Sequence, residues 1–292
     1  MANTTAETGI EIRHPASQDA EECGRICFEA FRSIAERHSF PPDFPSPEMA
    51  AGVMSMLIAH PGIYGVVAER DGRVVGSNFL DERSTIAGVG PITVDPGVAD
   101  AGIGRRLMAE VLERAAKRDF RGVRLLQSAY HTRSFSLYAK LGFAVREVLA
   151  TMQGDPIGES VPGHVVRPAQ EGDVEECNHL CAATHGHDRA GELRDAVAQG
   201  AAQVVQREGA IVGYTTGIAF FGHSIAQTDE ALKALIGAAP EFGGPGFLLP
   251  ARNVEVFGWC SERGLRVVHL MTLMTRGDYQ EPTGPFMPSI LY

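Results

Sequence analysis

Residues 12–27 read IRHPASQDAEECGRIC, and they recur without a gap at residues 166–181 as VRPAQEGDVEECNHLC. Six residues of the first segment are identical in the second, namely Arg13, Asp19, Glu21, Glu22, Cys23 and Cys27. Self-similarity of this kind is the signature of a duplicated structural unit. The fold is therefore expected to contain two copies of one unit.

Two further segments repeat in the same order along the chain. Residues 67–76 (VAERDGRVVG) recur at 204–213 (VVQREGAIVG), and residues 141–152 (LGFAVREVLATM) recur more weakly at 263–274 (RGLRVVHLMTLM). The offset between copies shrinks along the chain, which indicates that the second copy has lost residues. Turn residues cluster over 154–164, so we expect the boundary between the copies there.

Composition restricts the class of protein. The chain has 292 residues, of which 44% are hydrophobic and 21% charged, as in a soluble globular protein. Its formal net charge of −10 argues against binding to nucleic acid or to an anionic membrane. Five cysteines are too few, and odd in number, for a disulfide framework. With no membrane-length apolar run and no secretory signal pattern, the expected location is the cytoplasm.

The hydrophobic pattern of the first copy mixes helices and strands. Apolar residues at helical spacing predict a helix from Asp19, which is a candidate N-terminal cap, and an Asp-Gly turn predicts a hairpin. The expected order is helix, hairpin, strand, helix, strand, helix and strand, over residues 19–34, 65–80, 86–94, 104–118, 123–129, 133–141 and 144–153.

A strand, a loop and a glycine-rich helix start follow one another in residues 92–108, ITVDPGVADAGIGRRLM. The free N–H groups and the dipole of a helix's first turn attract anions, and glycine lets a phosphate approach the backbone. Gly102 and Gly104 open the expected helix, and Arg105 and Arg106 add positive charge. The stretch predicts a site for a phosphate-bearing ligand, with close packing of helix and strand as the plain structural alternative.

The glycine pattern does not fit a dinucleotide-binding fold. That fingerprint needs a third glycine three residues further on, early in a βαβ unit. Leu107 occupies that position here, and the segment lies in the middle of the first copy. Residues 101–124 nevertheless hold seven Lys or Arg against three acids, a basic patch in an acidic chain.

Residues 131–143, HTRSFSLYAKLGF, supply a second motif. Together with the strand end before Pro96 and the Gly-x-Gly helix start, they resemble the GNAT superfamily of acetyl-CoA-dependent N-acetyltransferases, over residues 10–153. The resemblance implies an α+β fold with two tandem units, each a mixed, mostly antiparallel sheet flanked by helices. It implies an active acetyltransferase domain at residues 1–158 and a degenerate GNAT-like domain at residues 163–292.

The resemblance also implies site residues by their positions in the motifs. The pantetheine arm would pair with strand residues 92–94, the pyrophosphate would lie on the amides of 99–105, and Tyr138 would face the sulfur as general acid. The implied coenzyme-contacting residues are Ile92, Thr93, Val94, Ala99, Asp100, Gly102, Ile103, Gly104, Arg105, His131 and Ser134.

The chain departs from the family pattern in three places. Ala99 and Asp100 stand where Gln or Arg and then Gly are common, and Asp100 would bring a negative charge near the phosphates. His131 replaces an Asn that often contacts the coenzyme. Gly88 stands where some members carry a general-base Glu, so a base would have to come from elsewhere.

The expected reaction is direct acetyl transfer to an amine. A neutral amine attacks the thioester carbonyl while a backbone N–H near Thr93 and Val94 stabilises the oxyanion. A Tyr hydroxyl with a pKa of about 10 can protonate a thiolate whose thiol has a pKa of about 8.5. Asp81, Glu82 and His38 are candidate bases, and a water chain, or no base at all, is the alternative.

The second copy lacks these features. Residues 218–242 run from a strand into a helix capped near Thr228 or Asp229 with no Gly-x-Gly, and Cys260 aligns with Tyr138. The GGPG stretch at 243–246 leads into a strand and is typical of a turn. One bound acetyl-CoA per chain is therefore expected.

Other side chains have simpler interpretations. Cys177, Cys181, His185 and His187 could line one helix face as metal ligands, but buried cysteines at this spacing favour a core, and no metal is expected. Residues 37–46 could form a lid over the acceptor or a plain surface loop. The apolar tail 284–292 should dock on a domain of this chain or on a second subunit, so a homodimer is possible.

Two alternatives to an enzyme stay open at this stage. The departures at Ala99, Asp100 and Gly88 would also fit a non-catalytic acyl-CoA-binding or regulatory module. A purely structural dimerisation protein would leave the basic patch and the glycine loop without a role. The expected partner of an enzyme is a small-molecule or peptide amine acceptor, with no nucleic acid and no membrane.

Overall fold

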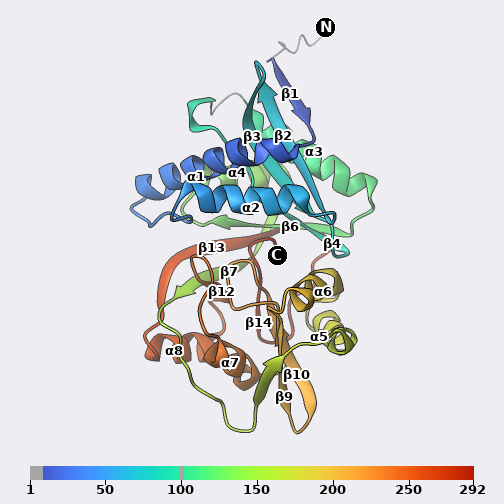
Figure 1. Ribbon diagram of the computed structural model, residues 1–292, viewed down its shortest axis with the longest axis vertical. Coiled ribbons are helices and arrows are strands. Elements are labelled where there is room, and N and C mark those ends of the chain that lie inside the picture. The colour runs from blue at the N-terminus through green and yellow to red at the C-terminus, as the bar shows by residue number, and fades with distance from the viewer. Residues whose placement is uncertain (1–8, 99–101) are drawn as a thin grey trace. The chain divides into compact units, whose positions relative to one another are not determined.

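The computed structural model describes residues 9–98 and 102–292, which fold into two compact units (Figure 1). Met1–Asp81 and Val89–Asp119 form the first unit, and Glu82–Gly88 and Phe120–Tyr292 form the second. Each unit combines helices with mostly antiparallel strands, which confirms the predicted α+β class. This division into two units reflects which residues pack together, and it differs from the division into two repeat copies. The repeat boundary near residues 154–164 stays a prediction about the duplication.

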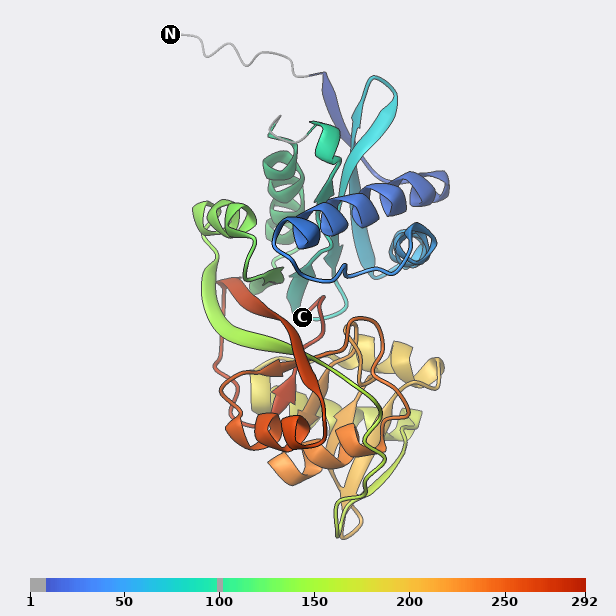
Figure 2. The ribbon, with the colours of Figure 1, turned by 90° about the vertical axis from the view of Figure 1, so that its left-hand side faces the viewer.

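The first unit is an antiparallel sheet with helices on both faces (Figure 2). Helices α1 and α2 pack together against one face, and α3 packs against the other. Strand β3 is buried along almost its whole length, as expected for a strand covered on both sides. The elements are β1 (Ile10–Arg13), η1 (Ser17–Asp19), α1 (Ala20–Arg37), α2 (Pro47–Ala59), β2 (Ile63–Arg70), β3 (Arg73–Asp81), β5 (Thr93–Val94), η2 (Pro96–Val98) and α3 (Ile103–Lys117).

Two expectations for the first copy of the repeat need correction. Asp19 does not cap α1 through its side chain. Its carboxylate instead accepts the Ala16 N–H at 2.7 Å, which closes the preceding 3₁₀ turn η1. The single strand expected over 86–94 is two strands, β4 (Ile86–Val89) and β5, because Gly90 has a φ of 143° and Pro91 has no N–H to donate.

Helix α2 is not among the elements expected from the sequence. Its start is marked by Ser46, whose hydroxyl accepts the Met49 N–H, and by Pro47 in the first helical position. Its buried residues are spaced as one helical face, but apolar residues also lie on the exposed side. The amphipathic contrast is therefore weak, which is why the periodicity did not reveal it.

The second unit contains two sheets. One has the strand order β4-β6-β13-β7-β12, with β4 mostly in this unit, and the other has the order β14-β11-β10-β9-β8. Helices α5 and α7 both pack on the second sheet. The elements are β6 (Gly122–Ser128), α4 (Thr132–Lys140), β7 (Ala144–Gln153), β8 (Val165–Pro168), η3 (Glu171–Asp173), α5 (Val174–His185), α6 (Ala190–Ala198), β9 (Gln203–Arg207), β10 (Ala210–Thr215), β11 (Ser224–Ala226), α7 (Asp229–Ala238), β12 (Phe247–Pro250), α8 (Val254–Glu262), β13 (Arg266–Gly277) and β14 (Phe286–Met287).

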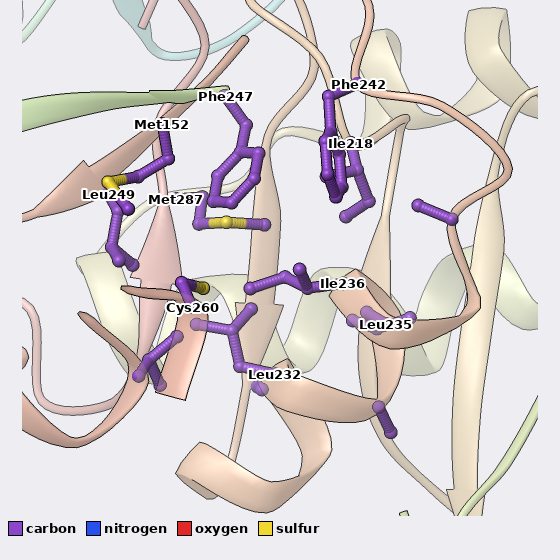
Figure 3. Packing of buried hydrophobic residues seen from close by; sticks show 14 of the residues in the cluster. Met152, Ile218, Leu232, Leu235, Ile236, Phe242, Phe247, Leu249, Cys260 and Met287 are labelled. Atoms are coloured by element: carbon purple, nitrogen blue, oxygen red, sulfur yellow. The ribbon is translucent and has the colours of Figure 1, made fainter. Parts of the chain in front are cut away.

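Adjacent residues of β9 face two different cores. Val204 packs with the α5 and α6 side chains, whereas Val205 packs with α7 and α8. This alternation follows from the two-residue period of a strand. Figure 3 shows the second of these cores, where Leu232 and Ile236 of α7 lie near Phe247 and Cys260.

The repeats fold alike in detail. In the first copy, Arg13 Nη1 and Nη2 contact the two Asp19 oxygens at 2.6 and 3.0 Å. In the second, Arg167 contacts Asp173 at 2.7 and 2.9 Å. The hairpin turns also match, because Asp71-Gly72 and Glu208-Gly209 all have φ between 52° and 86°. Two copies of one structural unit are thereby supported residue by residue.

The last strands of the two copies are exchanged. Strand β13, from the second copy, lies between β6 and β7 of the first, and β7 pairs in turn with β12 of the second copy. Leu149 pairs with Met271, which is its own counterpart in the repeat alignment. The β7–β13 pair therefore has a local two-fold axis at these two residues.

Candidate functional site

Helix α3 begins without a side-chain cap. Its N-cap is Gly102, whose φ of 73° and ψ of 9° place it in the left-handed region that glycine adopts without strain. No acidic residue lies in the first turn, and Arg105 there is exposed. Ile103 is buried and anchors the helix, while Gly104 is half-buried. Among the described residues, the N-cap thus leaves the first-turn N–H groups without a side-chain cap. The expected contacts at Ala99 and Asp100 lie outside the described residues.

The corresponding helix of the second copy is closed to an anion. The Thr228 hydroxyl accepts the Ala231 N–H at 3.2 Å, and this confirms the expected cap of α7. Asp229 and Glu230 lie in its first turn. These carboxylates neutralise the helix dipole and would repel a phosphate. Within the described residues, the two copies thus differ in the chemistry of their helix starts as the sequence predicts.

Strand β5 packs against β3 inside the first unit, through one side-chain contact and one close backbone approach. The Thr93 hydroxyl lies 3.1 Å from the Ser77 hydroxyl of β3. Val94 pairs with Gly76, where an added Cβ would come within 2.7 Å of the Thr93 carbonyl oxygen. Glycine at position 76 therefore permits the close approach of β5. Ile92 precedes this strand and is half-buried.

Tyr138 lies on α4 in the second unit. Its side chain is 6% exposed and packs edge-on against Phe143, with ring centroids 6.2 Å apart. Burial raises its pKa above the ordinary value of 10.0, so the hydroxyl keeps its proton at neutral pH. Its counterpart Cys260 on α8 is fully buried in the core and has a thiol pKa of about 12. The second copy therefore has a buried thiol in place of the phenol at this position.

The two other residues expected to contact the coenzyme flank the start of α4. His131 is the N-cap residue of this helix, and its carbonyl accepts the Ser134 hydroxyl at 3.0 Å. Ser134 also contacts Gln127 Oε1 at 3.2 Å, and Gln127 donates to Thr272 at 2.6 Å. Strand β13 of the second copy therefore helps to fix the residues at the start of α4.

Asp43, in the segment 38–46 that joins α1 to α2, was not expected as a functional residue. Its Oδ1 atom is buried and has no hydrogen-bond partner among the described residues. Burial alone raises the pKa of this carboxyl from 3.8 to about 6. Phe44, next to it, packs against Phe31 of α1 with ring centroids 6.2 Å apart. The sequence signal was weak, because one Asp among prolines is typical of a surface loop.

The proposed bases occupy separate positions. Asp81 is buried at the end of β3, Glu82 follows it in the chain, and His38 directly follows α1. Their positions alone do not select one of them as a base, so all three stay predictions.

The four residues weighed as metal ligands have other surroundings. Cys177 and Cys181 lie in the hydrophobic core under α5. His185 and His187 are buried, and His187 Nε2 lies 3.2 Å from Arg124 Nη1. Burial and the nearby Arg124 charge lower the pKa of His187 to about 3. In residues 9–98 and 102–292, no group of three or more His, Cys, Asp and Glu is arranged to hold a metal ion.

A buried cluster of charged groups in the second unit was missed from sequence. The Glu192 carboxylate accepts Arg189 and lies 3.1 Å from His223 Nδ1. Arg124 is only 1% exposed, and burial together with the Arg189 charge lowers its pKa to about 9. Both guanidinium groups lie over the Tyr292 ring, at 4.0 and 4.9 Å from its centroid. The cluster has one carboxylate, Glu192, for two guanidinium groups, and the contact of both groups with the Tyr292 ring supplies further stabilisation of their positive charge.

The apolar tail docks on its own chain. Strand β14 pairs with β11, and Phe286, Met287 and Tyr292 are 2–3% exposed. Of the two partners expected for the tail, the structure therefore shows a domain of the same chain. In the part of the chain described, no helix combines the length and the apolar character needed to cross a membrane.

Comparisons with known proteins agree with the expected family. Residues 29–143 match the acetyltransferase (GNAT) family. None of the curated protein sequences compared with the chain matches it. The predicted resemblance is thereby confirmed for this segment, which is less than half of the chain.

Solved structures match over nearly the whole length. An acetyltransferase-like protein from Pyrococcus horikoshii is 19% identical with a TM-score of 0.73, and the match covers 95% of this chain and 92% of that one. A GCN5-related N-acetyltransferase from Sphaerobacter thermophilus is 16% identical with a TM-score of 0.62, over 95% and 98%. A tandem GNAT protein of the clavulanic acid biosynthesis pathway is 17% identical with a TM-score of 0.54, over 92% and 98%. These matches confirm the tandem α+β fold.

Proposed function

We propose that this chain, whose residues 29–143 match the GNAT acetyltransferase family, is an N-acetyltransferase that moves an acetyl group from acetyl-CoA to an amine acceptor. The observation that carries the proposal is the contrast between two equivalent helix starts. Helix α3 opens with Gly102 and no first-turn acid, whereas α7 opens with a Thr228 cap and two acids. The acceptor would be a small molecule or a peptide.

The residues of the first unit would hold the coenzyme through their backbone. The amides of residues 99–105 would bind the pyrophosphate, with Ala99, Asp100, Ile103 and Gly104 contributing main-chain contacts and Arg105 a cation. Ile92, Thr93 and Val94 would pair with the pantetheine arm. His131 and Ser134 complete the proposed contact set.

The chemistry needs few groups from the protein. Bound acetyl-CoA supplies an activated thioester carbonyl. A backbone N–H near Thr93 or Val94 would stabilise the negative charge that develops on the carbonyl oxygen. Tyr138, protonated at neutral pH, would donate its proton to the departing thiolate. The second copy would bind no coenzyme and would serve as a scaffold.

The proposed compartment and partners rest on the state of the cysteines and on the net charge. All five cysteines are free and buried, as is usual for a protein of the reducing cytoplasm. The net charge of −10 disfavours nucleic acid and anionic membranes as partners. A homodimer remains possible.

Calorimetric titration with acetyl-CoA tests the binding part of this proposal. We expect one site per chain. Arg105→Glu places an acid in the first turn of α3, as in α7, and should weaken binding roughly tenfold or more. Arg105→Gln is the matched control and should weaken binding less, since it adds no negative charge. Absence of binding by the unaltered protein would overturn the proposed function, and two sites would show that the second copy is active.

Turnover of the Tyr138→Phe variant tests the chemical part. Loss of the proton donor should lower the rate of acetyl transfer about 10²–10⁴-fold while acetyl-CoA binding stays unchanged. Tyr279→Phe is the control, because Tyr279 shows ring contacts with Arg124 and Arg146 that phenylalanine retains. An unchanged rate in Tyr138→Phe would remove Tyr138 from the mechanism.

A further inference from the structure

Strand β13 of the second copy contacts the connection between β6 and α4 at two points. The Ala129 N–H donates to the Leu270 carbonyl at 2.9 Å, which is a backbone contact. Gln127 of β6 is 5% exposed and lies directly opposite Thr272 in the β6–β13 register. Its amide Nε2 donates to the Thr272 hydroxyl at 2.6 Å, which is a side-chain contact. The connection that leads into α4 is therefore held by both the backbone and a side chain of the second copy.

The Gln127 amide extends the side-chain contact to α4. Because its Nε2 atom is directed at Thr272, its Oε1 atom accepts the Ser134 hydroxyl, at 3.2 Å. The His131 carbonyl also accepts this hydroxyl, at 3.0 Å. A serine hydroxyl has a single proton and two lone pairs, and here the proton is directed into the protein. The half-buried Ser134 oxygen can therefore accept a hydrogen bond from a ligand but has no proton left to donate.

The second copy shows what the same positions hold where no coenzyme is expected. In the β12–β7 register, Leu249 lies opposite Ala150 as Gln127 lies opposite Thr272 in the β6–β13 register. Val256 of α8 stands at the place of the α4 serine. Leu249, Ala150 and Val256 are fully buried in one hydrophobic core, in which Leu249 is labelled in Figure 3. The fold thus accepts three apolar side chains in place of the polar chain.

The backbone contact is the same in the two copies. The Ala251 N–H donates to the Val148 carbonyl at 2.9 Å, as Ala129 donates to Leu270. The exchanged strands therefore support both helix connections equally through their backbones. The polar side chains stand only in the copy whose α3 begins with Gly102. Buried polar groups are costlier than apolar ones unless they are satisfied, so their presence in this copy points to a role beyond folding.

We propose that Thr272 is a positioning residue for coenzyme binding. This inference rests on the proposed function, in which Ser134 contacts acetyl-CoA. Thr272 fixes the orientation of the Gln127 amide, and the amide holds the Ser134 proton, so that the Ser134 oxygen accepts an N–H group of the coenzyme. Such groups are the amides of the pantetheine arm and the adenine amino group. The second copy thereby contributes a side chain to coenzyme affinity in addition to its backbone.

Calorimetric titration of the Thr272→Val variant with acetyl-CoA tests this role. Valine keeps the size of threonine but cannot accept the Gln127 N–H, so the Kd should rise about threefold to tenfold, the effect of one hydrogen bond. Thr272→Ser restores the hydroxyl and should bind within about twofold of the unaltered protein. Thr275→Val is the matched control, because Thr275 lies on the same strand and accepts Arg146 Nε at 3.0 Å. Its Kd should stay within about twofold.

A double-mutant cycle separates positioning from general destabilisation. Ser134→Ala should raise the Kd by a factor similar to that of Thr272→Val. In the Ser134→Ala background, Thr272→Val should add less than about twofold, because both changes remove the same contact. Gln127→Leu introduces the residue that the second copy has at this place, and it should match Thr272→Val. This variant also tests the proposal if Thr272→Val does not fold.

Titration with S-acetylpantetheine, which lacks the nucleotide, identifies the N–H group. A loss of affinity in Thr272→Val with both ligands assigns the contact to a pantetheine amide, and a loss with acetyl-CoA alone assigns it to the adenine amino group. Unchanged acetyl-CoA affinity in Thr272→Val, an equal loss in Thr275→Val, or additive losses in the cycle would overturn the positioning role. Failure of the unaltered protein to bind acetyl-CoA would instead overturn the proposed function.

Discussion

Replacing Asp43 with asparagine should stabilise the folded protein at neutral pH. The folded carboxyl has a pKa of about 6 against an ordinary value of 3.8, a difference of about two units. At 1.36 kcal/mol per unit this amounts to about 3 kcal/mol. The Asp43 side chain is partly exposed, and asparagine brings its own buried amide, so we expect a gain of about 1–3 kcal/mol at pH 8.

The direction of the pH dependence follows from the raised pKa. Below pH 3.8 the carboxyl is protonated in both the folded and the unfolded chain, and the fold has its full stability. Between pH 3.8 and about 6 the unfolded chain loses this proton while the folded chain keeps it, so this part of the stability is lost over that range and is fully lost above about pH 6. An asparagine side chain at this position cannot ionise. The advantage of Asp43→Asn should therefore be small near pH 4.5 and reach its maximum above pH 7.

Urea unfolding at pH 4.5 and pH 8 measures this difference. Far-UV circular dichroism is the suitable probe, because the chain has one tryptophan, Trp259, and it lies in the second unit. Asp71→Asn should leave the free energy of unfolding nearly unchanged at both pH values. If Asp43→Asn destabilises the protein equally at both, the carboxylate is satisfied in the fold and the reasoning fails. A stabilised but inactive variant would show that the burial of this acid serves function.

Two predictions concern the second unit, where Trp259 fluorescence reports urea unfolding. Leu149→Ala and Met271→Ala, at the two-fold axis between β7 and β13, should each lower the free energy of unfolding by about 2–5 kcal/mol, because both side chains are buried. Val148→Ala, at an exposed neighbour, should cost less than about 1 kcal/mol, and a loss equal to that of Leu149→Ala would contradict the exchanged pairing. Thr228→Ala should cost about 1 kcal/mol by removing the α7 cap, whereas Thr228→Ser should retain it; no difference between the two would show that the cap contributes nothing.

Local patterns in the sequence predict much of this fold. The hairpin around Asp71-Gly72, helix α3, and the Thr228 cap of α7 each depend on short-range chemistry, and each is observed. The duplication is also visible, because Arg13–Asp19 and Arg167–Asp173 form matching pairs. Such features are decided by neighbours in the chain, so one sequence is enough to find them.

The features that sequence analysis missed depend on long-range packing. Strands β7 and β13 have similar sequences. The hydrophobic pattern of either strand therefore does not show whether the strand will pair with strands of its own copy or of the other copy. Helix α2 has no clear polar face. Asp43 and Arg124 are charged residues that ordinarily lie in water, and the burial of the Asp43 Oδ1 atom and of the Arg124 side chain depends on how other segments pack around them.

The strand exchange makes the second copy indispensable to the first. Strand β13 satisfies the edges of both β6 and β7, and the chain runs from β6 directly to the helix that carries Tyr138. Removing the second copy would leave those edges bare and open to aggregation. If the second copy binds no coenzyme, as proposed, it contributes its backbone to the first copy, and deletion of its last strand should cost more stability than substitutions at the start of α7.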